Sequence, residues 1–369
     1  MAPEAQSRIR AAGPLRLAVG TLALLAVVIW APASTAAKKH RPTCFGHALT
    51  IRGTLGADHI VGTRHRDVID TFSGKDTVHG RAGNDLICTG SRGDTAAGGS
   101  GNDRIDTFRG NDVLVGDYLN SSGTDGNDLL RGGPGHDVEV GDQYMRSGDA
   151  SGNGDDALHA GRSRDISVGD AYAPHGAAIG RGRDHQDGGP GNDLIVGDGL
   201  GATRALGRGS DNLEGEAGAD LIVGDADATG EGAKAVGAAG DHFFADKGDD
   251  HVVGDSYAAR GDALGAADDA GTGGRGHDLL VGDDAAGVLA SGNGGNDMFM
   301  GDRKSDVLIG DNEALVPGAQ TSGGGNDFLR CGPSHDRFHA GPGRNHCQGG
   351  PGHDRDLSAP RCEKRGSIP

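Results

Sequence analysis

The stretch Gly188–Asp198, GGPGNDLIVGD, combines four glycines, one proline and two aspartates with only three aliphatic residues. Close relatives recur at residues 132–142 (GGPGHDVEVGD) and 273–283 (GGRGHDLLVGD). Glycine adopts positive φ without a Cβ clash, so each copy is typical of a tight turn followed by a short strand. The repetition of this stretch, and not any single copy, therefore determines the fold.

The aspartate that precedes the aliphatic pair recurs every nine residues. It occurs seven times without interruption from Asp58 to Asp112, and then in couples nine residues apart. Twenty-four aspartates and Asn345 hold this position in 25 nonapeptides. Position eight of the unit is mostly aliphatic, and one unit cannot bury that face alone. The units must therefore coil and stack into a solenoid.

The copies GGSGNDRI at 98–105, GGPGNDLI at 188–195 and GGRGHDLL at 273–280 resemble the haemolysin-type calcium-binding (RTX) repeat family. The resemblance implies an all-β fold, namely a right-handed parallel β-roll (β-solenoid). Two nonapeptides make one turn, so we expect about 12 turns. Multiple Ca²⁺ ions are expected in the glycine turns between successive coils.

The resemblance also implies the ligands, because Ca²⁺ prefers six or more hard oxygens and a glycine turn can aim its carbonyls inward. The carboxylates predicted to bind Ca²⁺ are those of Asp58, Asp76, Asp85, Asp94, Asp103, Asp112, Asp128, Asp137, Asp156, Asp184, Asp193, Asp211, Asp220, Asp250, Asp269, Asp278, Asp297, Asp327, Asp336 and Asp354. The backbone carbonyls predicted to bind Ca²⁺ are those of Gly98, Gly99, Gly101, Gly132, Gly133, Gly135, Gly188, Gly189, Gly191, Gly273, Gly274, Gly276, Gly349, Gly350 and Gly352.

Four half-turns depart from the glycine pattern and are expected to be weak or vacant: 62–67, 160–165, 236–241 and 301–306. In the region 115–326 the couples are separated by short inserts of unequal length. Each insert follows an aliphatic-Gly-Asp step, so the inserts should form a row of loops on one edge, which we take as the partner-facing edge. The aliphatic residue of this step should form a second ladder, covered by Tyr118, Tyr144, Tyr172 and Tyr257. Its aspartate could supply an extra ligand column.

The chain divides into six predicted segments. Residues 1–37 have the basic start, apolar run and small residues of a secretory signal peptide, although a retained membrane anchor is the alternative. The expected order is then a lead or cap (38–52), uninterrupted β-roll (53–114), β-roll with inserted loops (115–326), uninterrupted repeats (327–357) and a tail (358–369). We therefore expect a secreted, extracellular bacterial protein with no membrane span after cleavage.

Five cysteines in an oxidising compartment favour disulfides. The candidates are Cys44 with Cys88, and Cys347 with Cys362 or Cys331. Each bridge would lie near one end, where solenoids need caps.

The net charge of −18 argues against a nucleic-acid partner and suits cations. Histidines precede several repeat aspartates but do not cluster as zinc ligands do, and no G-x-S-x-G motif occurs. We therefore expect no enzyme, but a calcium-binding protein that folds on binding Ca²⁺ and is disordered without it. The alternative is a calcium-stiffened cell-surface adhesin or structural rod that presents loops to a cell-surface or glycan partner.

Overall fold

The computed structural model describes residues 43–357 and 363–364. The predicted signal peptide, residues 38–42 and most of the tail, including Cys362, lie outside the described residues. Every regular element that is described is a β-strand, and no helix long and apolar enough to cross a membrane occurs among these residues. The prediction of an all-β solenoid is therefore confirmed.

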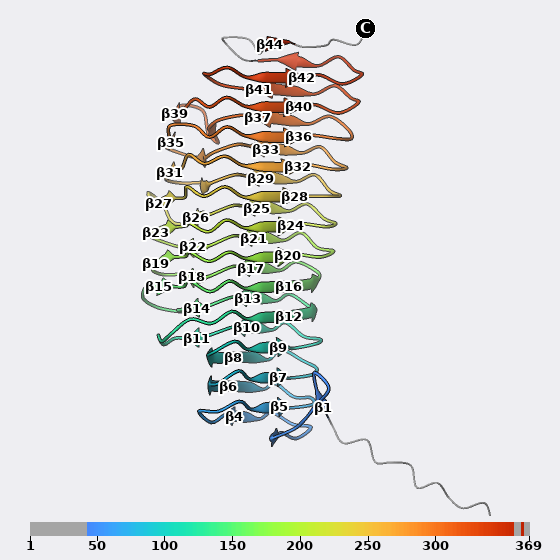
Figure 1. Ribbon diagram of the computed structural model, residues 1–369, viewed down its shortest axis with the longest axis vertical. Coiled ribbons are helices and arrows are strands. Elements are labelled where there is room, and N and C mark those ends of the chain that lie inside the picture. The colour runs from blue at the N-terminus through green and yellow to red at the C-terminus, as the bar shows by residue number, and fades with distance from the viewer. Residues whose placement is uncertain (1–42, 358–362, 365–369) are drawn as a thin grey trace, which may run out of the picture. The chain divides into compact units, whose positions relative to one another are not determined.

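Two long parallel sheets form the β-roll (Figure 1). Roll sheet I has 14 strands: β3 (Ile51–Arg52), β5 (Val68–Asp70), β7 (Leu86–Cys88), β9 (Arg104–Asp106), β12 (Leu129–Pro134), β16 (Ala157–Arg162), β20 (His185–Asp187), β24 (Asn212–Glu214), β28 (His242–Phe244), β32 (Ala270–Thr272), β36 (Met298–Met300), β40 (Phe328–Arg330), β42 (His346–Gln348) and β44 (Glu363–Lys364). Roll sheet II has 13 strands: β4 (His59–Val61), β6 (Thr77–Ala82), β8 (Thr95–Ser100), β10 (Val113–Val115), β13 (Val138–Val140), β17 (Ile166–Val168), β21 (Leu194–Val196), β25 (Leu221–Val223), β29 (His251–Val253), β33 (Leu279–Val281), β37 (Val307–Ile309), β41 (Arg337–His339) and β43 (Arg355–Asp356).

The strand register confirms that two nonapeptides make one coil. Val68 pairs in parallel with Leu86, which holds the same repeat position two nonapeptides later, and Phe328 pairs with His346 in the same way. Between these ends the coils are longer; for example, Ile166 pairs with Leu194 across two nonapeptides and an insert. The register of the roll therefore continues through all the inserts.

The aliphatic residues at position eight form the core between the two roll sheets, as predicted. Ile69, Ile87 and Ile105 from roll sheet I pack with Val78 and Leu114 from roll sheet II, and all five are fully buried. Three polar residues interrupt this core: Glu139, Ser167 and Gln186 occupy position eight and are also buried. The repeat therefore tolerates a local polar patch within an otherwise aliphatic core.

The sequence predicted that the inserts are loops, and this prediction is wrong. The inserts form strands of two further parallel sheets, which lie on the left edge of the view (Figure 1). Insert sheet I has eight strands: β11 (Tyr118–Leu119), β14 (Gln143–Tyr144), β18 (Ala171–Ala173), β22 (Gly199–Gly201), β26 (Ala226–Ala228), β30 (Ser256–Ala258), β34 (Ala285–Ala286) and β38 (Glu313–Ala314). Insert sheet II has seven: β15 (Ala150–Ser151), β19 (Ala177–Ile179), β23 (Arg204–Leu206), β27 (Lys234–Val236), β31 (Asp262–Leu264), β35 (Leu289–Ser291) and β39 (Gln320–Ser322). Their position on one edge is as predicted, and only their conformation differs.

Insert sheet I covers the second aliphatic ladder. Val168, Val196 and Val223, the last residues of their roll strands, are fully buried, and Tyr172 and Tyr257 pack against that ladder. The predicted covering role is confirmed for these two tyrosines. Tyr144 stacks on Tyr172 with ring centroids 4.9 Å apart.

The two insert sheets pack on each other mainly through a core of buried alanines. This core contains Ala205, Ala226, Ala228, Ala233, Ala235, Ala258, Ala263, Ala286 and Ala290, all of them buried. Small side chains permit a close approach of the two sheets, and their low hydrophobicity explains why the inserts read as loops in the sequence.

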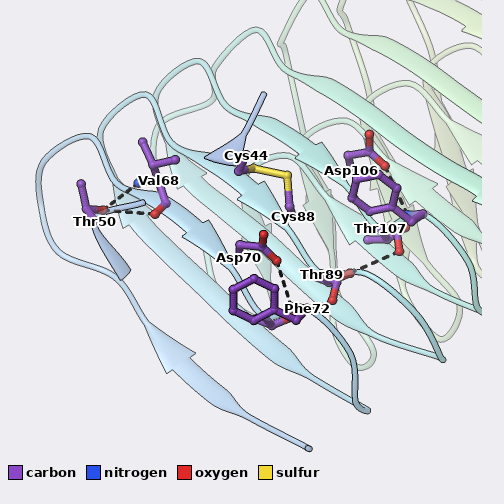
Figure 2. Close-up of a disulfide and its surroundings, with 11 residues drawn as sticks. Cys44, Thr50, Val68, Asp70, Phe72, Cys88, Thr89, Asp106 and Thr107 are labelled. Atoms are coloured by element: carbon purple, nitrogen blue, oxygen red, sulfur yellow. Dashed lines mark hydrogen bonds between the residues drawn. A yellow bond between two sulfur atoms is a disulfide. The ribbon is translucent and has the colours of Figure 1, made fainter. Parts of the chain in front are cut away.

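A small cap precedes the first coil. The antiparallel pair β1 (Thr43–Cys44) and β2 (His47–Ala48) is joined to the roll by the predicted Cys44–Cys88 disulfide (Figure 2). Cys347 is also disulfide-bonded, and its predicted partner Cys362 lies outside the described residues. Cys331 is buried and free, so the alternative Cys347–Cys331 bridge is wrong.

Candidate metal sites

The repeat aspartates form two columns, one along each edge of the roll. The first column lies at the edge without inserts, where each member precedes a strand of roll sheet II: Asp58, Asp76, Asp94, Asp112, Asp137, Asp165, Asp193, Asp220, Asp250, Asp278, Asp306, Asp336 and Asp354. The second column lies at the insert edge, where each member precedes a strand of roll sheet I: Asp67, Asp85, Asp103, Asp128, Asp156, Asp184, Asp211, Asp241, Asp269, Asp297, Asp327 and Asn345.

Each column is held together by one hydrogen bond per coil. The backbone N–H of every member except the last donates to the side-chain Oδ1 of the member in the next coil, over distances of 2.6 to 3.2 Å. This bond explains why a short carboxylate is repeated at this position. It also fixes the side chain so that only Oδ2 is left for another partner.

The Oδ2 atoms of most column aspartates are buried and make no hydrogen bond within the described residues. They include those of Asp76, Asp103, Asp156, Asp193 and Asp278. The first coil is different, because Asp58 Oδ2 accepts a hydrogen bond of 2.7 Å from the backbone N–H of Thr54. Unpaired buried carboxylate oxygens are costly, so a row of them indicates that the fold provides for a cation.

Electrostatics support this interpretation, since burial raises the pKa of Asp137 and Asp193 to about 8. At the insert edge the effect is larger: burial, aided by the charge of Asp128, raises the pKa of Asp103 to about 10. For Asp112, at the edge without inserts, burial raises the pKa to about 6. Without a cation, the ionised columns would oppose folding, most strongly at the insert edge.

The glycine turns leave space next to the unpaired oxygens. A Cβ on Gly132 would lie 2.6 Å from Asp137 Oδ2, and a Cβ on Gly273 would lie 2.6 Å from Asp278 Oδ2. Five of the predicted turn glycines adopt positive φ: Gly99, Gly101, Gly133, Gly189 and Gly274. Carboxylate oxygen next to glycine backbone, with no nitrogen or sulfur donor, is a donor set that suits Ca²⁺. The residues present therefore fit the ion that the repeat implies.

A third column of buried aspartates lies beside the second one. These are the aspartates of the aliphatic-Gly-Asp steps: Asp117, Asp142, Asp170, Asp198, Asp225, Asp255, Asp283 and Asp311. The extra ligand column suggested by the sequence is thus present as a structural feature. Asp125 and Asp284, which carry no repeat signal, also lie near this column. Asp125 joins a group with Asp117 and Asp142. Burial, reinforced by the charges of Asp255 and Asp283, raises the pKa of Asp284 well above its usual range.

Four groups of three carboxylates have ligand atoms within 4.8 Å of one another among the described residues. They are Asp103, Asp117 and Asp128; Asp117, Asp125 and Asp142; Asp142, Asp156 and Asp170; and Asp170, Asp184 and Asp198. Every group contains members of the third column, so these groups lie at the insert edge. The sequence suggested the third column at this edge but did not predict that Asp125 would join it.

The half-turns expected to be weak keep the common register. Asp165, Asp241 and Asp306 each accept the inter-coil hydrogen bond and leave Oδ2 unpaired, whereas Asp67 Oδ2 accepts a hydrogen bond of 2.7 Å from Thr63 N–H. The substitutions in these turns therefore do not displace the carboxylate. Their weaker binding stays a prediction.

The matching family model is described as the RTX calcium-binding nonapeptide repeat, in four copies. It covers residues 52–87, 89–117, 122–141, 206–228, 291–313 and 321–356. RTX calcium-binding nonapeptide repeats are therefore present between residues 52 and 356. A search of curated proteins found no match. Residues 142–205 and 229–290 lie between the matched segments, and there the parallel register of the roll strands continues across the inserts.

Proposed function

We propose that this RTX-repeat chain is a secreted calcium-binding protein that folds when Ca²⁺ enters both edges of its β-roll. Its activity is binding and not catalysis. The observation that supports the proposal is the continuous row of buried aspartates with an unpaired oxygen in nearly every coil. Successive coils are about 4.8 Å apart, so the ionised carboxylates repel one another unless a cation lies between them.

Binding and folding should therefore be coupled. The columns exist only when the coils are stacked, so the unfolded chain has no preformed site and the free energy of binding stabilises the fold. Extracellular calcium modules bind with dissociation constants of about 10⁻⁴–10⁻³ M, and we expect this range. Mg²⁺ should substitute poorly, because it demands octahedral geometry and retains its water.

The test is a calcium titration of the chain from residue 38 onward, followed by far-UV circular dichroism. At about pH 8, where the aspartates are ionised, the β signal should be absent in excess chelator, appear in millimolar Ca²⁺ and not appear in equal Mg²⁺. Identical spectra in chelator and in Ca²⁺ would refute the proposal. A broad hydrolase screen of the calcium-loaded protein should show no turnover.

A matched pair of variants tests the ligand assignment. Asp249 and Asp250 are neighbours in one turn, and each accepts a backbone hydrogen bond of 2.9 Å from an adjacent coil. Asp249 is exposed, whereas Asp250 is buried with an unpaired Oδ2. Asp250→Asn should reduce the number of bound Ca²⁺ ions in isothermal titration calorimetry, and Asp249→Asn should leave it unchanged. Equal losses would show that the register does not define the sites.

A second candidate is a calcium-stiffened cell-surface adhesin or structural rod. It is favoured by a row of half-buried aliphatic side chains that stand in parallel register on insert sheet II: Ile179, Leu206, Val236 and Leu264. A glycan array and a cell-binding assay, each with and without Ca²⁺, test this candidate. Binding that is lost in a Leu206→Ser, Val236→Ser variant with unchanged calcium-induced folding would support it, and no binding in Ca²⁺ would exclude it.

A further inference from the structure

We propose that the third aspartate column gives the insert-bearing coils their own class of calcium site, with two carboxylates per coil, and that this class fills before the sites at the edge without inserts. The inference rests on the proposed calcium-binding function and adds to it an order of filling and a set of ligands. The uninterrupted coils serve as an internal comparison, because they have Thr63, Arg81, Gly99 or Gly341 at the position of the third-column aspartate.

The third-column side chains are fixed by the return of the insert to the roll. One carboxylate oxygen of Asp142 accepts a hydrogen bond of 2.7 Å from Gly154 N–H, and Asp170 makes the same contact with Gly182 at 2.7 Å. The other oxygen of each, Oδ1, is buried and has no hydrogen-bond partner among the described residues. Asp142 and Asp170 are both fully buried. Asp142 and Asp170 therefore each hold one unpaired carboxylate oxygen in a fixed position at the insert edge.

These free oxygens point to the same place as those of the second column. Asp142, Asp156 and Asp170 have ligand atoms within 4.8 Å of one another, and Asp156 Oδ2 is likewise unpaired. A Cβ on Gly154 would lie 2.6 Å from Asp142 Oδ1 and 2.8 Å from Asp156 Oδ2, next to the carbonyl oxygen of Gly126. Because Gly154 has no Cβ, a space is left there. The carboxylates of Asp142 and Asp156 and the carbonyl group of Gly126 all border this space.

The charge per coil differs between the two edges. Each insert-bearing coil has at least two buried aspartates at the insert edge, for example Asp156 and Asp170, but one from the repeat column at the other edge, for example Asp165. One Ca²⁺ per coil makes the insert edge neutral, whereas the same occupancy at the other edge leaves excess positive charge. At short range an additional buried carboxylate attracts the cation strongly, so we expect dissociation constants at least about tenfold lower at the insert edge.

The tyrosines provide a probe that needs no mutation. All four tyrosines of the chain, Tyr118, Tyr144, Tyr172 and Tyr257, follow a third-column aspartate by one or two residues. Tb³⁺, an oxygen-seeking ion, emits when an adjacent tyrosine is excited. If the insert edge fills first, tyrosine-sensitised emission should rise from the first equivalents of Tb³⁺, approach its maximum near one ion per third-column aspartate, and fall when Ca²⁺ is added in excess. Emission that appears only after the circular dichroism change is complete would overturn the proposed order.

A count of bound Ca²⁺ against a chromophoric chelator tests the ligands directly. Wild type should show a tight class and a weaker class of ions. Asp170→Asn should remove about two ions from the tight class, because Asp170 belongs to two of the carboxylate groups, and should leave the weaker class unchanged. Asp155→Asn is the matched control, since Asp155 is the exposed neighbour of Asp156 and should change neither class. If Asp170→Asn does not fold, Asp117→Asn replaces it with the same expected result, because Asp117 also belongs to two of the groups.

The outcomes separate this inference from the proposed function. Calcium-dependent folding with a single class of sites, or with Asp170→Asn and Asp155→Asn indistinguishable, would overturn the inference and leave the proposed function intact. No calcium binding by the wild-type chain would overturn both.

Discussion

Glu139 offers a test of how the core of the roll is stabilised. It occupies position eight of its repeat in β13, where it pairs in parallel with Leu114 on one side and Ser167 on the other. The side chain is fully buried, and neither carboxylate oxygen has a hydrogen-bond partner of normal geometry in the described part of the chain. Burial, reinforced by the charge of Asp137, raises the pKa of Glu139 well above its usual range.

The polar neighbours of Glu139 make hydrogen bonds to other groups and none to the Glu139 carboxyl group. Ser167 Oγ donates to Gln186 Oε1 at 2.6 Å, and Gln186 Nε2 donates to the carbonyl oxygen of Val196 at 2.8 Å. An unsatisfied buried polar group costs about 1–3 kcal/mol, and leucine has nearly the volume of glutamate. We therefore expect Glu139→Leu to raise the free energy of unfolding by about 2 kcal/mol.

The assay is urea unfolding in saturating Ca²⁺, followed by far-UV circular dichroism, with Glu139→Gln as the control. Glutamine has the shape of the neutral acid and keeps the polar atoms, so its effect should be smaller than about 1 kcal/mol. A Glu139→Leu variant less stable than wild type would refute the reasoning, because it would mean that the carboxyl group has a stabilising partner.

Three further predictions concern the turns, the cap and the charge. Gly218→Ala should lower the free energy of unfolding of the calcium-bound protein by about 3 kcal/mol in urea, because the added Cβ would collide with the carbonyl oxygen of Gly191. Gly56→Ala is the control: its Cβ would meet only Thr54 Oγ1, at 3.9 Å, and should change the free energy of unfolding by less than about 0.5 kcal/mol. Cys88→Ser removes the disulfide between residues 44 positions apart, and by loop entropy this should lower the free energy of unfolding by about 4 kcal/mol. Backbone hydrogen exchange should therefore become faster in the first coils but not near residue 250. Burial raises the pKa of Asp193 to about 8 and that of Asp220 to about 7. In chelator, the folded chain therefore keeps protons on these carboxyl groups that the unfolded chain releases above about pH 4. This contribution to stability is lost as the pH rises from about 4 through 8, so metal-free protein should show more β signal at pH 5 than at pH 8, and an equal or reversed signal would contradict it.

The repeat was predictable because its period is explicit in the sequence. The nine-residue spacing from Asp58 to Asp112 requires that alternate aspartates share an edge, and the structure links Asp76 to Asp94 and Asp85 to Asp103 accordingly. Residue types at position eight then identify the core, since Ile69 and Ile87 meet in parallel register. The Cys44–Cys88 bridge was a candidate suggested by the position of both cysteines near one end, and the structure confirms it.

The insert sheets were not predictable by the same reasoning. Their strands have two or three residues each, and the inserts vary in length, so no fixed period marks them. Their core is alanine, as at Ala235 and Ala263, which is only weakly hydrophobic. These strands form because the roll beneath them holds equivalent segments about one strand spacing apart, and therefore tertiary context and not local propensity determines them.

The third column explains how inserts of different lengths leave the roll in register. Its aspartates accept a hydrogen bond from the residue at which the chain rejoins the coil: Gly126 for Asp117 after a short insert, and Ala239 for Asp225 after a longer one. The contact is the same although the segment it closes differs in length. A roll that depended on insert length would lose register at each coil, and the constant pairing of the roll strands shows that it does not. Because the same carboxylates also face the predicted ions, calcium binding and closure of the inserts should stabilise each other at this edge.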